Sequence, residues 1–182
     1  NDVEILDFLK LAELEPKALY FADSYGALLP ERVKELVGIF LKFTDNVGIH
    51  THDNLGLAFA NCLAGLDQGA NHIDGTILGM GRGVGNVKTE QLTTYLQYTQ
   101  NKYNSTYISK FISKWMEPLL TKYKWGFTHN YMVSGLKHIH PLYPQTLQAS
   151  YLNPQRIEGI LLDIEEPVSF DKSKIESTTT SD

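Results

Sequence analysis

Short apolar runs alternate with longer amphipathic stretches along the first hundred residues of the chain. Apolar positions at helical spacing predict a first helix over about 3–12, which Pro16 ends. Three short apolar runs, over 19–22, 47–52 and 72–78, predict buried strands.

An amphipathic helix is predicted after each strand. Pro30 suits the first turn of one helix, a second spans about 55–68 with Gly69 at its C-terminal cap, and Leu92 and Leu96 mark a third. Strands separated by helices need crossover connections, so we expect a parallel sheet. Loops and functional residues should then gather at the carboxyl ends of the strands.

The pattern changes after residue 100. Residues 108–116 predict another amphipathic helix, which Pro118 interrupts, and 155–162 a last short one. The polar end of the chain is typical of a disordered segment. We therefore expect an α/β part over 1–100, a helical region over 101–168 and a disordered tail over 169–182.

Composition narrows the class of protein. The 182 residues are 42% hydrophobic and carry a net charge of -5, as in a soluble globular domain. There is no polybasic block for nucleic acid and no apolar run of about 20 residues for a bilayer span. The only cysteine, Cys62, has no partner for an internal disulfide. This fits a reducing compartment, and we expect a cytoplasmic protein.

Two histidines are the first candidates for chemistry. His50 and His52 are two residues apart on a predicted strand, so both side chains point to one face. Two imidazoles at a strand end can bind one divalent ion. The spacing alone also fits two hydrogen-bonded histidines without a metal. Asp53 and Asn54 follow, where either could cap the next helix, and Asp53 could instead orient a metal-bound histidine.

The glycine-rich loop at 79–86 does not fit the known phosphate-binding patterns. It has Val84 and Asn86 where Gly-x-Gly-x-x-Gly would need glycine, and it lacks Gly-Lys-Ser/Thr. Asn86 could offer its side-chain oxygen to a metal or cap the following helix. The residues alone favour the cap.

Other polar residues stay open between two interpretations. Ser24 either belongs to a turn or donates a hydrogen bond to a substrate carboxylate, and Arg82 either faces an anionic substrate or solvent. Asp74 shares a strand face with His72 and has no assigned role. Cys62 lies in an apolar helix and is interpreted as a core residue.

Several motifs together resemble one family. These motifs are 22–26 (Ala-Asp-Ser-Tyr-Gly), 48–56 (Gly-Ile-His-Thr-His-Asp-Asn-Leu-Gly), 73–75 (Ile-Asp-Gly), 79–86 and Glu90. Their order and spacing resemble the pyruvate-carboxyltransferase-like metallolyases, a TIM-barrel group that includes 4-hydroxy-2-oxovalerate aldolase, 3-hydroxy-3-methylglutaryl-CoA lyase and the isopropylmalate and homocitrate synthases. The resemblance implies that the chain is the C-terminal part of a (β/α)8 barrel, with about three parallel strands, followed by a helical region.

The resemblance also implies roles. His50, His52 and Asn86 match ligands of a divalent ion, Mn or Mg, and Ser24 matches a substrate-contacting residue. The ion would act as a Lewis acid on a 2-oxo acid such as pyruvate and stabilise its enolate. Independently of this resemblance, we expect Arg82 of the glycine loop to contact the anionic substrate.

Within this group the chain is most similar to the 4-hydroxy-2-oxo acid aldolases, because its Asp-Ser-Tyr-Gly motif is short and its glycine loop lacks a catalytic cysteine. Tyr131 is a candidate acid or base, with packing as the alternative. His129, His138 and His140 are interpreted as surface or partner-contact residues. In aldolase-type relatives the C-terminal helices dock a dehydrogenase, so residues 105–165 are a candidate interface, and we expect a homo-oligomer for the full-length protein.

One departure limits the expected activity. The family takes a third ligand, an aspartate, from a first strand that this chain lacks, and three strands cannot close a barrel. We therefore expect the chain alone to be inactive, with weak metal binding at best. A non-catalytic fragment that serves as a protein-interaction module is the second hypothesis, and a Claisen-type acyl transferase is the third.

Overall fold

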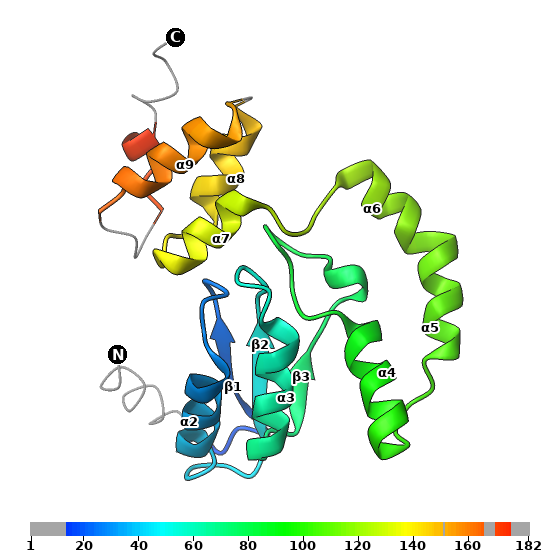
Figure 1. Ribbon diagram of the computed structural model, residues 1–182. Helices are drawn as coiled ribbons and strands as arrows, with labels where there is room; N and C mark the ends of the chain where they lie inside the picture. The colour runs from blue at the N-terminus through cyan, green and yellow to red at the C-terminus, as the bar shows by residue number, and fades with distance from the viewer. Residues whose placement is uncertain (1–13, 151, 166–169, 176–182) are drawn as a thin grey trace.

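The computed structural model describes residues 14–150, 152–165 and 170–175. Its centre is a sheet of three parallel strands in the order β1-β2-β3 (Figure 1). The strands are β1 (Leu19–Asp23), β2 (Val47–Thr51) and β3 (His72–Asp74). The predicted parallel α/β arrangement is therefore confirmed. The helix predicted over 3–12 lies outside the described residues.

Helices cover one face of the sheet. They are α2 (Pro30–Phe40), α3 (Ala58–Gln68) and α4 (Thr89–Gln100). Val47, Ile49 and Thr51 of β2 are fully buried beneath these helices, as expected for alternate residues of a strand with one covered face. Gly69 ends α3 with φ 116°, the left-handed conformation that favours glycine.

The opposite face of the sheet carries polar side chains. Tyr20, His72 and Asp74 are exposed there, and His50 is partly exposed. The ring of Tyr20 lies over Gly48, where an added Cβ would come within 2.3 Å of the ring. This face would line the interior of a closed barrel.

The third strand is shorter than predicted. β3 ends at Asp74, and a 3₁₀ turn, η2 (Ile77–Gly79), replaces the rest of the apolar run. Leu78 in this turn has φ 52°, which no strand residue adopts. The prediction of a strand through residue 78 is therefore wrong.

A long helical arm follows α4. It consists of α5 (Thr106–Phe111), a π-helical turn η3 (Ile112–Met116) and α6 (Glu117–Tyr123). Pro118 was expected to interrupt this helix, but the chain continues through it. Proline clashes with the carbonyl four residues earlier in a regular α-helix, and the π turn just before Pro118 changes that spacing.

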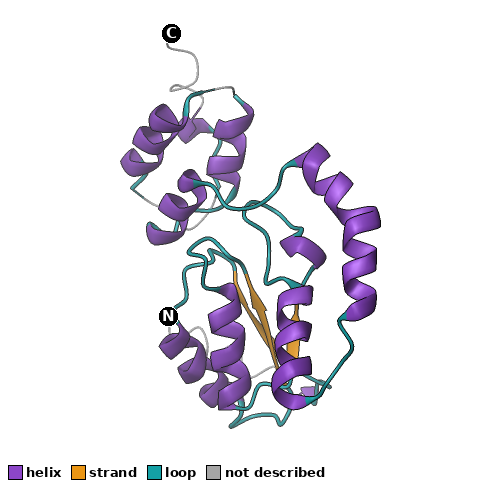
Figure 2. Ribbon diagram, turned by 45° about the vertical axis from the view of Figure 1, so that its right-hand side comes forward, coloured by secondary structure: helices purple, strands orange, loops and turns teal. Residues whose placement is uncertain are grey.

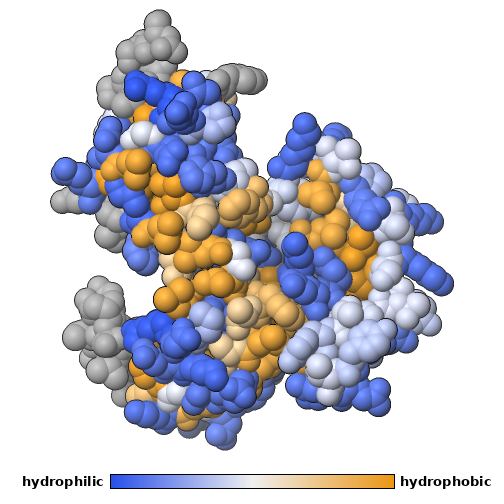
Figure 3. Space-filling view, viewed as in Figure 1, coloured by the Kyte–Doolittle hydropathy of each residue, from blue (hydrophilic) through white to orange (hydrophobic). Residues whose placement is uncertain are grey.

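The arm exposes several large apolar side chains, and Figure 3 shows a hydrophobic patch over part of it. Met116 is its only buried residue. A stripe at four-residue spacing is exposed, namely Tyr107, Phe111, Trp115, Leu119 and Tyr123. The arm is amphipathic as predicted, but Phe111 and Trp115 lie on its exposed side.

Three further helices form a second unit above the carboxyl ends of the strands (Figures 1 and 2). They are α7 (His129–Leu136), α8 (Leu142–Ala149) and α9 (Pro154–Asp163), and they enclose a separate apolar core. Part of the segment expected to be a disordered tail packs against this core. Phe170 contacts the Tyr143 ring at 4.9 Å between centroids, and Ile175 is buried. Among the described residues, no helix has the length and apolar character to cross a bilayer.

Candidate metal centre

The two histidines lie side by side at the carboxyl end of β2. Their ring centroids are 5.0 Å apart, with the ring planes at 74°. Both side chains are partly buried. The strand geometry therefore brings the two imidazoles together, as their spacing predicts.

A backbone carbonyl orients the ring of His52. Its Nδ1 lies 2.8 Å from the carbonyl oxygen of Asp23. A carbonyl only accepts, so Nδ1–H donates and the lone pair of the neutral ring is on Nε2. Burial lowers the pKa of His52, the hydrogen bond to Asp23 partly opposes this, and the charges of His50 and Arg82 lower the pKa further. The ring is thus neutral at pH 7, the form that binds a metal.

A carboxylate orients the ring of His50. Asp74 is the register partner of His50 on β3, and its Oδ2 lies 3.3 Å from Nδ1 of His50. A carboxylate that accepts from Nδ1–H leaves Nε2 of His50 available as a ligand. Asp74 has no role that the sequence alone reveals, because only the pairing register places it beside His50.

Asn86 offers an unsatisfied oxygen next to His52. The two residues form an isolated antiparallel bridge. The Nδ2 of Asn86 donates to the Met80 carbonyl at 3.3 Å, while its buried Oδ1 has no hydrogen-bond partner. A buried oxygen without a partner is costly, and a metal ion at this position would satisfy it. Two neutral imidazoles and an amide oxygen fit a divalent transition ion such as Mn²⁺.

Asn86 does not cap the next helix. Lys88 is at the N-cap of α4, which has no side-chain cap. The interpretation favoured by the residues alone is therefore wrong. Asp53, by contrast, binds the start of the next helix. Its Oδ1 accepts from the backbone N–H of Ala58, the first residue of α3, at 2.9 Å. Asp74, rather than Asp53, orients a histidine.

The three candidates for substrate binding or catalysis differ in how far they are exposed to solvent. Ser24 is exposed in the turn after β1, and Arg82 is exposed in the glycine loop. Tyr131 is buried, and its ring packs against Gly83, where an added Cβ would lie 3.0 Å from the ring. Burial raises the pKa of Tyr131, and the positive charge of Arg82 opposes this. The second helical unit therefore brings Tyr131 to the glycine loop.

His140 was not expected near this loop. It is partly buried, whereas His129 and His138 are exposed as predicted. Burial lowers the pKa of His140, with a smaller effect of the charge of Arg82. Its Nδ1 accepts from the backbone N–H of Leu142 at 3.2 Å. No local sequence pattern distinguishes it from the two exposed histidines.

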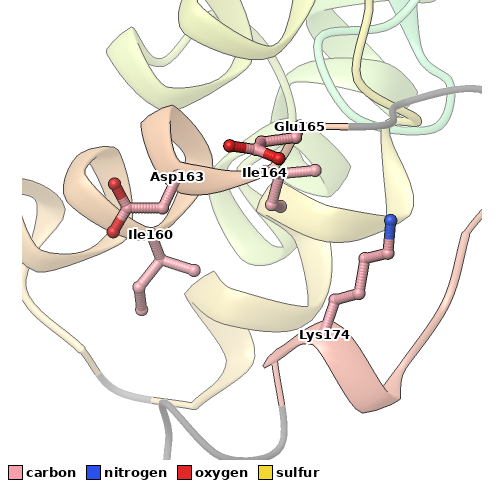
Figure 4. A pocket seen from close by; sticks show the side chains of 5 residues that line it. All are labelled: Ile160, Asp163, Ile164, Glu165 and Lys174. Carbon is pink, nitrogen blue, oxygen red and sulfur yellow. The ribbon is translucent and has the colours of Figure 1, made fainter.

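The ligand set lacks a carboxylate. Within the described residues, no group of three or more His, Cys, Asp and Glu side chains could hold a metal. A pocket of about 310 Å³ lies elsewhere, between α9 and the segment 170–175 (Figure 4). Two of its lining residues are acidic, Asp163 and Glu165, and Lys174 completes its polar lining. None of the site candidates lines it.

Curated relatives resemble part of this chain. It is 47% identical over 81 residues to the 4-hydroxy-2-oxovalerate aldolase of Pelotomaculum thermopropionicum, an alignment that covers 43% of the chain and 24% of the relative. It is 42% identical over 82 residues to the oxaloacetate decarboxylase of Mycobacterium tuberculosis, covering 44% and 24%. The chain thus spans about a quarter of the length of the curated relatives it matches.

Solved structures share the fold. The N-terminal domain of a proposed aldolase from Bacteroides vulgatus is 38% identical, with a TM-score of 0.66 over 73% of this chain and 44% of that one. The HMG-CoA lyase of Bacillus subtilis is 26% identical, with a TM-score of 0.54 over 68% and 44%. The three strands and their helices therefore have the fold of part of a TIM-barrel lyase. Residues 3–113 match the HMGL-like family, and the chain belongs to that family.

Proposed function

We propose that this chain carries the metal-binding part of a divalent-metal-dependent aldolase or lyase. Its reaction would cleave or form a carbon–carbon bond in a 4-hydroxy-2-oxo acid, with pyruvate as the enolate partner. The observation that carries this proposal is the buried, unpartnered Oδ1 of Asn86 beside His52. The relatives named 4-hydroxy-2-oxovalerate aldolase support the substrate class.

His50, His52 and Asn86 would hold the ion, Mn²⁺ or Mg²⁺. When bound, it supplies Lewis-acid chemistry that polarises the oxygens of a 2-oxo acid. Asp74 and the Asp23 carbonyl keep the two imidazoles in the tautomer that presents Nε2. The protein thereby fixes both rings before any ligand arrives, which reduces the cost of ordering them on binding.

The other candidates would act on the substrate. The exposed guanidinium of Arg82 can pair with a substrate carboxylate in two parallel hydrogen bonds, and the hydroxyl of Ser24 can donate to it. A tyrosine is already protonated at neutral pH, and burial raises the pKa of Tyr131 further above its ordinary value. It therefore suits a proton or hydrogen-bond donor to a substrate oxygen better than a general base.

The ligand set predicts weak binding. Two imidazoles and one amide bring no negative charge to the ion, and a tight site for Mn²⁺ usually includes a carboxylate. We propose that catalysis needs a further acidic ligand from a segment equivalent to the first barrel strand. Adding such a segment should tighten metal binding and is required for aldol cleavage.

Calorimetric titration with Mn²⁺ tests the site. We compare the wild-type chain with His50→Ala/His52→Ala and Asn86→Ala, and use His129→Ala/His138→Ala as a matched control for loss of two exposed histidines. Binding that is lost in the first two variants and kept in the control supports the site. A folded wild-type chain that binds no Mn²⁺, or a control that loses binding equally, would contradict it.

A second candidate function is protein interaction through the arm. Large apolar side chains exposed at four-residue spacing, Trp115 and Tyr123 among them, are unusual for a surface without a partner. Lys110, Lys114 and Lys122 each precede one of these aromatic residues, so the matching surface should be apolar with acidic side chains at its rim. We propose a dehydrogenase as that partner.

Light scattering during size-exclusion chromatography tests this second function. The chain is mixed with a dehydrogenase that associates with an aldolase of this family. Complex formation by the wild-type chain, lost in Trp115→Ser/Tyr123→Ser but kept in the exposed control Tyr98→Ser, supports it. A complex that survives the double substitution would place the interface elsewhere.

A further inference from the structure

Leu78 has an unfavourable backbone conformation at the start of the glycine loop. Its φ is 52° and its ψ 24°, in the left-handed region where a side chain crowds the backbone. The next residue, Gly79, also has positive φ, but glycine adopts it without cost. A leucine stays in this conformation only when its surroundings hold it there.

Two side chains bind the polar backbone atoms of Leu78. The carboxylate of Glu90, in the first turn of α4, accepts from the backbone N–H of Leu78 at 3.1 Å. The indole Nε1–H of Trp125, just after α6, donates to the backbone oxygen of Leu78 at 2.9 Å. Both polar backbone atoms of this strained residue are therefore bound by side chains that lie 12 and 47 positions away in sequence.

The held turn supports Asn86 directly. The oxygen of Gly79 accepts from the backbone N–H of Asn86 at 3.2 Å, and the oxygen of Met80 accepts from its Nδ2 at 3.3 Å. These two contacts fix the backbone and the amide plane of Asn86. Since the amide Nδ2 is held, its Oδ1 is also fixed in place.

We propose that Glu90 and Trp125 are positioning residues for the metal centre. They hold Leu78 in its left-handed conformation, which places the oxygens of Gly79 and Met80 where they orient the side chain of Asn86. Naming Asn86 as a ligand rests on the proposed function. Trp125 lies just after the helical arm, so its hydrogen bond to Leu78 also connects the arm to this loop.

Mn²⁺ affinity of the full chain tests the positioning role, measured by calorimetry and by electron paramagnetic resonance of the free ion. Glu90→Ala should weaken binding by about tenfold, as for other residues that orient metal ligands. Glu90→Gln keeps an acceptor oxygen and should restore most of the affinity. Trp125→Phe keeps the ring without its N–H and should cause an intermediate loss. Gln91→Ala, exposed on the same helix, is the control and should bind as the wild type does.

A second variant separates a positioning effect on the loop from a general loss of folded structure. Leu78→Gly removes the side chain that makes positive φ costly, so the loop no longer depends on both contacts. Glu90→Ala should therefore weaken binding much less in the Leu78→Gly background than in the wild type. Equal losses in both backgrounds would overturn the proposal, as would a Glu90→Gln variant as weak as Glu90→Ala.

Hydrogen exchange gives a readout that does not need the metal. The amides of Leu78 and Asn86 should exchange faster in Glu90→Ala than in Gln91→Ala, and fluorescence of a Trp115→Phe chain reports Trp125 alone. Unchanged exchange and emission overturn the positioning role, whatever the Mn²⁺ result. If the wild-type chain binds no Mn²⁺ but Glu90→Ala still exchanges faster, the result would support the contacts that hold Leu78 and contradict the proposed metal function.

Discussion

The side-chain amide of Asn54 donates to the backbone oxygen of Tyr131 at 3.0 Å, although the two residues are 77 positions apart. Asn54 is buried and also lies 3.4 Å from the hydroxyl of Ser134. Gly135 allows this approach, because an added Cβ there would come within 2.9 Å of the Asn54 side chain. This contact fastens α7 above the strand ends and so brings Tyr131 to the glycine loop.

Asn54→Ala should destabilise the chain by about 1 kcal/mol, because it removes one buried hydrogen bond from the carbonyl of Tyr131, which still accepts from the hydroxyl of Ser134 at 2.8 Å. Asn54→Asp should cost more, because a carboxylate cannot donate and would face that carbonyl. Urea unfolding followed by circular dichroism measures both. The control is Asn71→Ala, which removes exposed hydrogen bonds to Asp45 and Asn46 and should cost under about 0.5 kcal/mol. Equal losses of unfolding free energy at both sites would contradict the role of the buried Asn54 contact in holding α7.

The glycine loop depends on Gly85. Its φ is 91°, and an added Cβ would lie 1.7 Å from the backbone oxygen of Gly79. Gly85→Ala should therefore destabilise the chain by more than about 2 kcal/mol and abolish Mn²⁺ binding. Gly56→Ala separates overlap from backbone strain, because Gly56 has φ 71° with nothing within 4 Å of an added Cβ. It should cost about 1 kcal/mol. Thermal unfolding that ranks the two alanines equally would contradict the steric argument.

Sequence patterns predicted the elements that depend on local alternation. The strand containing Val47 and Ile49 follows from its apolar run, and the shared face of His50 and His52 follows from strand geometry. These features need only near neighbours in the chain. The parallel sheet was also predictable from the order of the elements, because each strand is separated from the next by a helix.

The features that were missed depend on distant contacts. The apolar run ending at Leu78 has strand composition, but Glu90 and Trp125 hold Leu78 in a turn. Asp74 acquires a role only through its register with His50. For Asn86 the residues alone favoured a cap, and only the family resemblance implied a metal ligand, because a buried, unpartnered oxygen is not visible in the sequence.

His52 should make stability depend on pH. Burial lowers its folded pKa below the ordinary value of 6.5, so the unfolded chain binds more protons between these two pKa values. Its contribution to the free energy of unfolding is full above about pH 6.5 and is lost as the pH falls through the folded pKa. Mn²⁺ affinity should weaken over the same range, because protons compete for the ring.

Urea unfolding at pH 7.5, 6.5 and 5.5 measures this dependence. His52→Gln has no titrating ring and should show a flatter profile, while the exposed control His129→Gln should retain the wild-type slope. His140 has a pKa lowered in the same direction and contributes in both variants. A His52→Gln profile as steep as that of the wild type would show that His52 does not titrate in this window.

Cys62 should be unreactive in the folded chain. It lies in α3 and is fully buried, as predicted for a core residue, and burial raises its pKa to about 11. Its Sγ lies 3.4 Å from the hydroxyl of Thr51, a contact too weak to offset that burial. The reactive thiolate is therefore scarce at pH 7, and access also requires local unfolding.

Labelling with iodoacetamide should be slow in buffer and fast in urea, with a transition that coincides with unfolding by circular dichroism. Fast labelling of the fully folded chain would contradict both the burial and the raised pKa. Cys62→Ala should leave Mn²⁺ affinity unchanged and cost about 1 kcal/mol of stability, as expected for the loss of one small buried side-chain group.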